Sequence, residues 1–354
     1  FAEATTPGSC ANSFTLTRTW TVTDDCGNSN TYTQNITVQD TTPPVINCPA
    51  DLTLQCGDPS NDMQISDWLA SATGSDNCGD VTITNLYRLN GGDITVAGNI
   101  TTTDTSYSGS GTIVLDGDGD QVISANGGVG ELHNFEVNKT SGDVTLQDSI
   151  QMSGDVTVAA GQVDATGATV EFQGNNSINA PGMQFGDVVF NASTVDVTGD
   201  LDIDGDVTIT NLYRLNGGDI TVAGNVTTTD TSYSGSGTIV LDGDGDQVIS
   251  ANGGVGELHN FEVNKTSGVV SVQDRIQVSG DLAVAAGELD ARGATIEFQG
   301  NPEVSAVDAR FGDVVVNAST VTLNGDLVVE GHLEVTSLYR LNGGTIYACL
   351  LYTS

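Results

Sequence analysis

Three observations predict an all-β chain whose larger part is a parallel β-helix, a solenoid of stacked coils. The residues VTITNLYRLNGGDITVAG begin at Val81 and again at Val207, and a shortened copy begins at Leu333, so the chain repeats every 126 residues. Short apolar-x-apolar stretches recur about every six residues, bounded by Gly and Asp. Aromatic residues make up only 5% of the chain, and no long apolar stripe has the 3.6-residue period of a helix.

Differences between the two full repeats indicate which side chains face the core. Residues 81–142 and 207–268 differ only at Ile100 and Val226, whereas later positions diverge. Seven diverged pairs exchange one apolar residue for another: Leu146/Val272, Met152/Val278, Val156/Leu282, Val163/Leu289, Val170/Ile296, Val197/Leu323 and Ile203/Val329. Positions between them change freely, as at Asp202 and Val328, which is typical of strands with one face in a core and one in water. We expect the apolar face to point inward.

Strand spacing predicts the size of a coil. Val195, Leu201 and Val207 each open a three-residue apolar-x-apolar stretch, and Gly-Asp pairs lie between these stretches. Three such strands with their bends would make one coil of about 18 to 22 residues, so that one repeat holds six or seven coils. Glycine supplies the backbone angles of the bends, and Asp is expected to hydrogen-bond its own backbone there. Residues 81–346 would then form a rod roughly 60 Å long, at about 4.8 Å per coil.

The repeat sets the domain boundaries of the solenoid. We assign residues 81–206 to the first repeat, 207–332 to the second and 333–348 to the start of a third. Residues 349–354, CLLYTS, resemble a translated sequencing adaptor, so we set Cys349 to Ser354 aside as an artefact. The chain begins at Phe1 without an initiator Met or a signal peptide, which predicts a fragment of a longer protein.

The first 80 residues have a different composition. They contain five of the six cysteines, namely Cys10, Cys26, Cys48, Cys56 and Cys78, and the repeats from 81 to 346 contain none. No CxxC motif occurs, and the chain has few lysines. The clustering therefore favours disulfides formed in an oxidising compartment over a metal site.

The segment from Thr17 to Ser60 resembles the hyalin-repeat-like, immunoglobulin-type modules of secreted Bacteroidetes surface proteins. Three features carry the resemblance: the WTVTDDCGN strand and turn, the VQDTTPP linker and the CPADLTLQCG opening of a next module. It implies that residues 1–42 are the end of one immunoglobulin-like β-sandwich module and that residues 43–80 are part of a second. The second half of that module does not follow. The junction near residue 80 is either a genuine boundary or an artificial join.

The repeat also resembles a known class of units. Residues Gly111 to Leu146, GTIVLDGDGDQVISANGGVGELHNFEVNKTSGDVTL, are similar to units of large β-helical Bacteroidetes surface proteins. The resemblance covers about 265 residues of this chain. It implies a β-helical fold and a secreted, cell-surface location more than it implies an activity.

The net charge of the chain limits the classes of partner that we expect it to bind. Nine basic residues stand against 46 acidic ones, for a formal net charge of −37. Such a chain repels nucleic acid and anionic lipid, so we expect neither as a partner. No run approaches the 18 apolar residues of a membrane span.

The acidic loop DGDGD is the sharpest candidate for a metal site. It occurs at Asp116, Asp118 and Asp120 and again at Asp242, Asp244 and Asp246. Alternating carboxylates on a Gly-rich loop are typical of calcium ligands, although Gln121 and Gly127 stand where an EF-hand loop needs Gly and Glu. The alternative interpretation is a solvated Asp-Gly turn. Calcium is thus the one candidate cofactor.

A second candidate is an aromatic and cationic pair repeated along the rod. Tyr87 and Arg88 recur as Tyr213 and Arg214, and once more at Tyr339. If these side chains face outward, they would form a multivalent surface for an extracellular glycan or protein. The alternative is that Tyr packs at a coil corner and that Arg covers it.

Catalysis is not indicated. His133 and His259 are copies of one repeat position, His332 is isolated where the previous repeat has Asp206, and most cations are repeated copies. No Ser-His-Asp or His-metal spacing is present in the sequence. We therefore expect a non-enzymatic extracellular surface protein, an adhesin or a stalk that spaces binding modules. Two alternatives stay open: the non-catalytic binding or spacing part of a secreted polysaccharide-acting β-helix enzyme, and a calcium-stiffened structural fibre.

Overall fold

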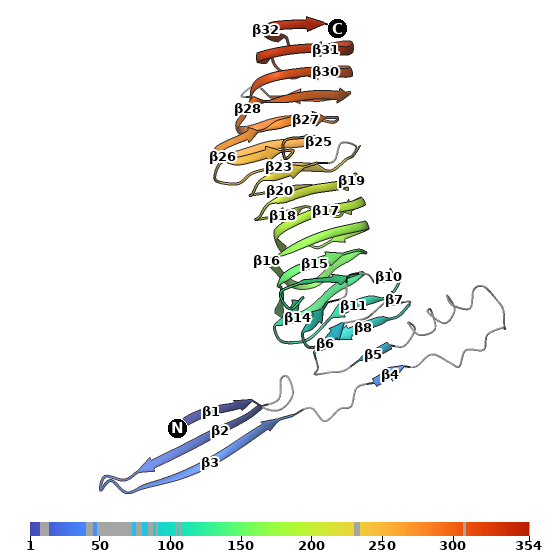
Figure 1. The fold of residues 1–354 in the computed structure, drawn as a ribbon. Helices are drawn as coiled ribbons and strands as arrows, with labels where there is room; N and C mark the ends of the chain where they lie inside the picture. The colour runs from blue at the N-terminus through green and yellow to red at the C-terminus, as the bar shows by residue number, and fades with distance from the viewer. Residues whose placement is uncertain are drawn as a thin grey trace, which may run out of the picture.

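The computed structural model describes residues 1–7, 14–39, 45–47, 73–75, 80–83, 88–89, 91–103, 105, 108–229, 234–306 and 309–353. Within these ranges the fold is all-β and contains no helix, as the sequence predicts (Figure 1). A parallel β-solenoid of about 13 turns makes up most of it.

A small antiparallel sheet precedes the solenoid. Its strands are β1 (Ala2–Pro7), β2 (Phe14–Thr23) and β3 (Ser29–Val38), in the order β1-β2-β3. Trp20 lies opposite Tyr32 in the β2–β3 hairpin, and both side chains are exposed. Two short strands, β4 (Val45–Asn47) and β5 (Thr73–Ser75), form a second antiparallel pair. The sheet is a small β module, and its immunoglobulin-type assignment stays a prediction.

Four of the clustered cysteines, Cys10, Cys48, Cys56 and Cys78, lie outside the described residues. Cys26 lies at the tip of the β2–β3 hairpin, where it is exposed and free. The carboxylate of Asp24 holds this tip, because its Oδ1 accepts the backbone N–H groups of Cys26 at 3.0 Å and Asn28 at 2.8 Å. The prediction of a disulfide is therefore not met at Cys26, because the hairpin tip extends its thiol into solvent.

The solenoid strands pair in parallel with the strands of the coils before and after them (Figure 1). In the first repeat they are β6 (Val81–Ile83), β7 (Arg88–Leu89), β8 (Asp93–Val96), β9 (Ile100–Thr102), β10 (Ser108–Gly109), β11 (Thr112–Leu115), β12 (Gln121–Ser124), β13 (Val129–Leu132), β14 (Phe135–Leu146), β15 (Asp148–Met152), β16 (Val156–Asn179), β17 (Met183–Val197) and β18 (Leu201–Ile203). They continue as β19 (Val207–Gly217), β20 (Asp219–Val222), β21 (Val226–Thr228), β22 (Ser234–Gly235), β23 (Thr238–Leu241), β24 (Gln247–Ser250), β25 (Val255–Leu258), β26 (Phe261–Val272), β27 (Asp274–Val278), β28 (Leu282–Gly300), β29 (Glu303–Ser305), β30 (Ala309–Leu323), β31 (Leu327–Gly343) and β32 (Ile346–Thr353).

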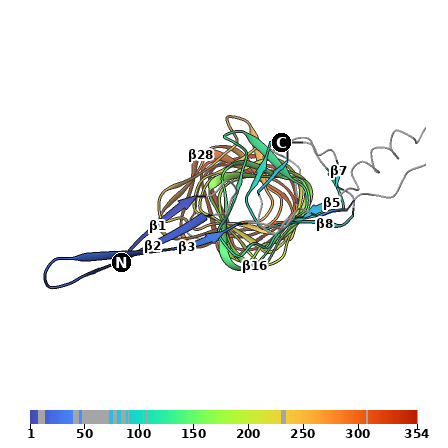
Figure 2. The same ribbon diagram turned by 90° about the horizontal axis from the view of Figure 1, so that it is seen from below.

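The coils are stacked around a common core and overlap when viewed along the axis (Figure 2). One coil contains three strand segments, for example β18 and the two parts of β19 that a register shift separates. Residues on neighbouring coils are separated in sequence by 18 residues at the shortest, from Gln184 to Asp202, and by 23 at the longest, from Val226 to Ile249. Long strands such as β16 bend at corners, where their pairing shifts register. At a strand spacing of about 4.7–4.9 Å, about 13 turns make a rod close to the length that the sequence predicts.

The core is a continuous column of apolar side chains. All seven apolar pairs that the repeats exchange are buried, from Leu146 and Val272 to Ile203 and Val329. Asp202 and Val328, between them, are exposed. The inward face is therefore confirmed. Each fully buried Val, Leu or Phe contributes about 1.5–3 kcal/mol of transfer free energy, which is why these positions accept only apolar exchanges.

The sequence repeat does not match a whole number of coils. Six coil steps starting at Val81 end at Ile203. Val81, Ile100, Ile123 and Leu146 pair in succession, the adjacent pair Thr145–Asp164 continues the stack, and Ala165, Phe185 and Ile203 complete it. Val207 is the counterpart of Val81 in the second repeat. It begins β19, which lies on the side of the coil that follows the side containing Ile203. One repeat thus spans six coils and one further side, and equivalent surfaces of successive repeats face in different directions around the rod.

Aspartates at the corners join neighbouring coils. The Oδ1 atom of Asp187 accepts the backbone N–H of Asp206 at 2.9 Å, and that of Asp206 accepts the N–H of Asn225 at 2.7 Å. The sequence predicts that Asp bonds its own backbone, and this is confirmed at Asp164 and Asp290, whose Oδ1 atoms accept the N–H groups of Thr166 and Arg292. At other corners the bond crosses to the neighbouring coil, because that coil brings an N–H group within reach of the short carboxylate.

The segment set aside as adaptor-like is placed as part of a strand. β32 pairs with β31 from Ile346 to Thr353 and so continues the parallel ladder. Among the described residues, no helix is long and apolar enough to cross a membrane.

Candidate functional site

Each DGDGD loop surrounds a buried lysine ammonium. Lys139 is only 2% exposed, and its Nζ donates to Gly117 O at 2.5 Å, Gly119 O at 2.8 Å and Gln121 Oε1 at 2.6 Å. Gln121 in turn donates from Nε2 to the carbonyl oxygens of Val96, at 2.9 Å, and Gly98. All three protons of the ammonium therefore have an acceptor, two of which are carbonyl groups of the loop.

The second repeat forms the same arrangement. Nζ of Lys265 donates to Gly243 O and to Gln247 Oε1, the latter at 2.5 Å. The chain has two lysines, and both are used in this way. Burial lowers the pKa of each lysine, and the nearby loop aspartates oppose this effect, with Asp120 the strongest for Lys139 and Asp242 for Lys265.

The six loop aspartates are exposed and do not converge on one point. Asp120 Oδ1 accepts the N–H of Asp143 at 3.1 Å, and Asp118 Oδ1 accepts the hydroxyl of Thr140 at 3.3 Å, so these carboxylates join coils. Asp116, Asp242, Asp244 and Asp246 are likewise exposed. No group of three or more His, Cys, Asp or Glu side chains suited to a metal occurs in the described part of the chain. Calcium at these loops stays a prediction, and the loop carbonyl groups already bind an internal cation.

The Tyr and Arg pair of the second repeat faces solvent. Tyr213 is 58% exposed, and the guanidinium carbon of Arg214 lies 5.8 Å from the centre of its ring. Tyr339 is 86% exposed. Tyr87 lies outside the described residues, and of Arg88 only the strand position, in β7, is described. The outward orientation that a binding surface needs is therefore present at Tyr213 and Arg214.

The one-side advance of the repeat separates these candidate surfaces. Tyr213 lies in β19, after the part of that strand that is one side further round the coil than β18. Tyr339 has the equivalent position in β31, but it lies one side further round the coil than Tyr213. The loops at Asp116–Asp120 and Asp242–Asp246 are separated in the same way. The rod thus presents its repeated surfaces as a spiral and not as one stripe, which the sequence period alone does not indicate.

A cluster of Glu, Ser and His recurs in both repeats and was not predicted. His133 Nδ1 lies 2.8 Å from Ser153 Oγ, and that hydroxyl also contacts Glu131, which is 3% exposed. Ser279 contacts His259, at 2.7 Å, and Glu257 in the same way. These residues are about one coil apart in sequence, so a search for stacked positions could have found them.

This cluster does not have the geometry of a hydrolase triad. In a triad the carboxylate holds the His and the other ring nitrogen meets the serine. Here His133 and Glu131 both contact Ser153, and the second ring nitrogen, Nε2, lies 3.0 Å from Gly109 O. Burial lowers the pKa of His259, opposed by Asp281. The cluster ties three successive coils together.

We expect the Asp290–Arg292 pair to contribute to the pH dependence of the free energy of unfolding. Hydrogen bonds from Arg292 lower the pKa of Asp290 to about 2. Because the folded pKa lies below the ordinary value of 3.8, the stabilisation is present above about pH 4 and is lost as the pH falls toward 2. Arg292→Gln should remove this part of the acid dependence, and the effect should be small because solvent screens the exposed Arg292. Urea unfolding between pH 5 and pH 2 measures it, and parallel curves for both proteins would contradict it.

The fold and these repeated surfaces define a parallel β-solenoid repeat protein. Comparisons with protein-family models, with curated proteins and with solved structures gave no match for this chain.

Proposed function

We propose that the chain is part of a secreted cell-surface protein whose solenoid is a non-enzymatic adhesive stalk. The observation that carries this proposal is the advance of each repeat by one side of the coil, which distributes equivalent surfaces around a long rod. Such an arrangement suits multivalent contact from any direction, whereas a catalytic centre needs one asymmetric set of groups. The resemblances to hyalin-repeat-like modules and to β-helical Bacteroidetes surface proteins support an extracellular location.

An adhesion assay with an activity readout tests this proposal. Beads coated with the chain should be retained on glycan-coated or extracellular-protein-coated surfaces, and retention should rise steeply with coating density because several weak contacts act together. Incubation of the same chain with the retained polysaccharide should release no reducing ends. Release of reducing ends would favour the alternative of a polysaccharide-acting enzyme. Beads that are never retained would contradict an adhesive role.

A calcium-stiffened fibre is the second candidate, favoured by the net charge of −37 and by the aspartates along the corners. A clear rise in melting temperature on adding calcium, reversed by a chelator, would support it. We expect only a small response, because Lys139 and Lys265 already bind the loop carbonyl groups.

A further inference from the structure

A groove recurs at equivalent positions of the two repeats. The first groove, of about 490 Å³, is lined by Asp148, Thr166, Asp187 and Asp204 together with glycine turns. The second groove, of about 550 Å³, is lined by Asp274, Arg275, Arg292, Asp313 and Glu330 and the corresponding glycines. Both run along a corner of the rod over four coils, and both volumes are typical of sites for small ligands.

Glycine turns explain why a hollow exists at this corner. A Cβ atom on Gly186 would lie 2.5 Å from Thr166 O, and one on Gly312 would lie 2.4 Å from Arg292 O. Stacked backbone therefore excludes side chains from the floor in both repeats. The hollow follows from the coil geometry and by itself indicates no ligand. The side chains at its rim carry the inference.

The rim differs between the two grooves by two cations. Arg275 stands where the first repeat has Ser149, and Arg292 stands where it has Thr166. The first groove has acidic and neutral side chains only, whereas the second combines two guanidinium groups with three carboxylates. Of the seven arginines in the chain, two thus line one groove of the second repeat.

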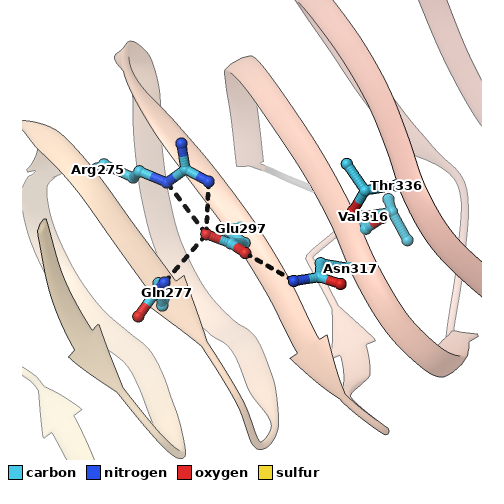
Figure 3. A network of polar contacts seen from close by, with 6 residues as sticks. All are labelled: Arg275, Gln277, Glu297, Val316, Asn317 and Thr336. Atoms are coloured by element: carbon cyan, nitrogen blue, oxygen red, sulfur yellow. Dashed lines mark hydrogen bonds and ion pairs between the residues drawn. The ribbon is translucent and has the colours of Figure 1, made fainter. Parts of the chain in front are cut away.

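Arg275 is held in place by a buried carboxylate (Figure 3). Its Nε and Nη2 donate to Glu297 Oε2 at 3.1 and 2.7 Å, and the Glu297 side chain is only 5% exposed. Gln277 and Asn317 also donate to Glu297, at 3.1 and 3.2 Å. Burial raises the pKa of Glu297, but these hydrogen bonds outweigh it and the pKa lies below its ordinary value. The remaining guanidinium nitrogen of Arg275 points away from Glu297 (Figure 3).

Arg292 is fixed in a similar way. Its Nε and Nη2 donate to the two oxygens of Asp290 at 2.9 and 2.6 Å, while 47% of its side chain is exposed. Within the described part of the chain, Nη1 of neither Arg275 nor Arg292 has a hydrogen-bond partner. The groove therefore offers fixed donors beside the carboxylate acceptors of Asp313 and Glu330, without loss of side-chain entropy on binding.

We propose that the second groove, and not the first, binds an uncharged oligosaccharide. Neighbouring sugar hydroxyl groups would accept hydrogen bonds from Nη1 of Arg275 and Arg292 and donate to Asp313 and Glu330. An anionic ligand is disfavoured, because each guanidinium is already paired with a carboxylate and the chain is strongly acidic. The groove has a polar rim and extends along the corner over four coils, so it suits a flexible chain of linked sugar units. This inference rests on the adhesive function proposed above and names its site.

Reciprocal exchange between the grooves tests the inference. The whole chain is applied to an array of uncharged and uronic-acid oligosaccharides, and the best retained sugar is titrated calorimetrically. Arg275→Ser with Arg292→Thr converts the second groove to the residues of the first, and should weaken binding at least about tenfold, a loss of about 1.4 kcal/mol. Ser149→Arg with Thr166→Arg should raise the stoichiometry from one site to two. The first repeat already has the carboxylates Glu171 and Asp164 at the positions that correspond to Glu297 and Asp290.

Each outcome decides between the two proposals. Unchanged affinity in the Arg275→Ser, Arg292→Thr variant, with an unchanged melting temperature, overturns the groove site but leaves the adhesive function standing, with Tyr213 and Arg214 as the next surface to mutate. Retention of uronic-acid sugars alone overturns the uncharged class of ligand. Retention of no sugar overturns the groove site, while bead adhesion to protein-coated surfaces decides the adhesive function separately. A gain of the second site in the Ser149→Arg, Thr166→Arg variant supports the inference even if the loss variant is unstable.

Discussion

Gly217→Ala is expected to unfold the coils around β19, with a loss of more than about 4 kcal/mol. Two separate costs meet at this corner. Gly217 has a φ of 99°, which L side chains rarely adopt, and an added Cβ would lie 1.9 Å from Val197 O in the coil before it. The obstructing atom belongs to a paired backbone, so it cannot move without breaking the ladder between β17 and β19.

Two other glycines separate these costs. Gly199 has a φ of 81° but open space around its Cβ position, so Gly199→Ala should cost about 1–2 kcal/mol. Gly167 has neither a positive φ nor a neighbour within 4 Å, so Gly167→Ala should change stability by less than about 1 kcal/mol. Hydrogen exchange of the β17–β19 amides, with denaturant unfolding of all three variants, measures the series. Equal effects for Gly199→Ala and Gly217→Ala would contradict the role of coil stacking.

The inward face could be predicted because it depends on a local period. A strand alternates its side chains, so Leu146 and Ile203 can be assigned to the core from their immediate neighbours and from their apolar counterparts Val272 and Val329. The coil length could also be predicted from the sequence, because three short strands and their bends limit it to about 20 residues.

The contacts that make up the candidate sites could not be predicted in the same way. The hydrogen bond from Lys139 to Gln121 spans 18 residues of sequence, whereas the one from Ser153 to Glu131 spans 22. Coil lengths vary between 18 and 23 residues, so the partner of a given side chain depends on loops throughout its coil. The same variation hides the advance by one side per repeat, because 126 residues fit six or seven coils equally well.

The lysine in the DGDGD loop shows that a loop pattern typical of cation binding can hold a cation from the chain itself. Oxygen-rich Gly loops do bind cations, and this loop directs Gly117 O and Gly119 O toward one. The cation is the ammonium of Lys139, from a strand of the next coil, and the pattern within the loop carries no information about it. A strongly acidic rod thereby keeps a positive charge inside each loop.

Lys265→Met is expected to destabilise the second repeat by about 2 kcal/mol, because a buried acceptor left without its donor costs about 1–3 kcal/mol. Gly243 O would lose its donor, whereas Gln247 Oε1 would lose Nζ but still accept the backbone N–H of Gly243 at 3.1 Å. Loss of the charge would also leave Asp242 without the cation that lowers its pKa, which burial already raises. Arg310→Met removes one charge from an exposed pair with Glu288 and should cost under about 1 kcal/mol.

Denaturant unfolding of Lys265→Met and Arg310→Met, each with and without calcium, distinguishes a structural ammonium from a displaced metal site. If the ammonium itself stabilises the loop, added ammonium ions should restore part of the lost stability, because the methionine side chain reaches as far as the last carbon of the lysine and an ammonium ion fits the space that Nζ vacates. If calcium restores it instead, the aspartates of the loop can close around a metal once the lysine is gone, and the sequence pattern of a calcium loop would reflect a real capacity that Lys265 suppresses. Equal losses in the two variants would contradict both, since the buried ammonium would then matter no more than a solvated guanidinium.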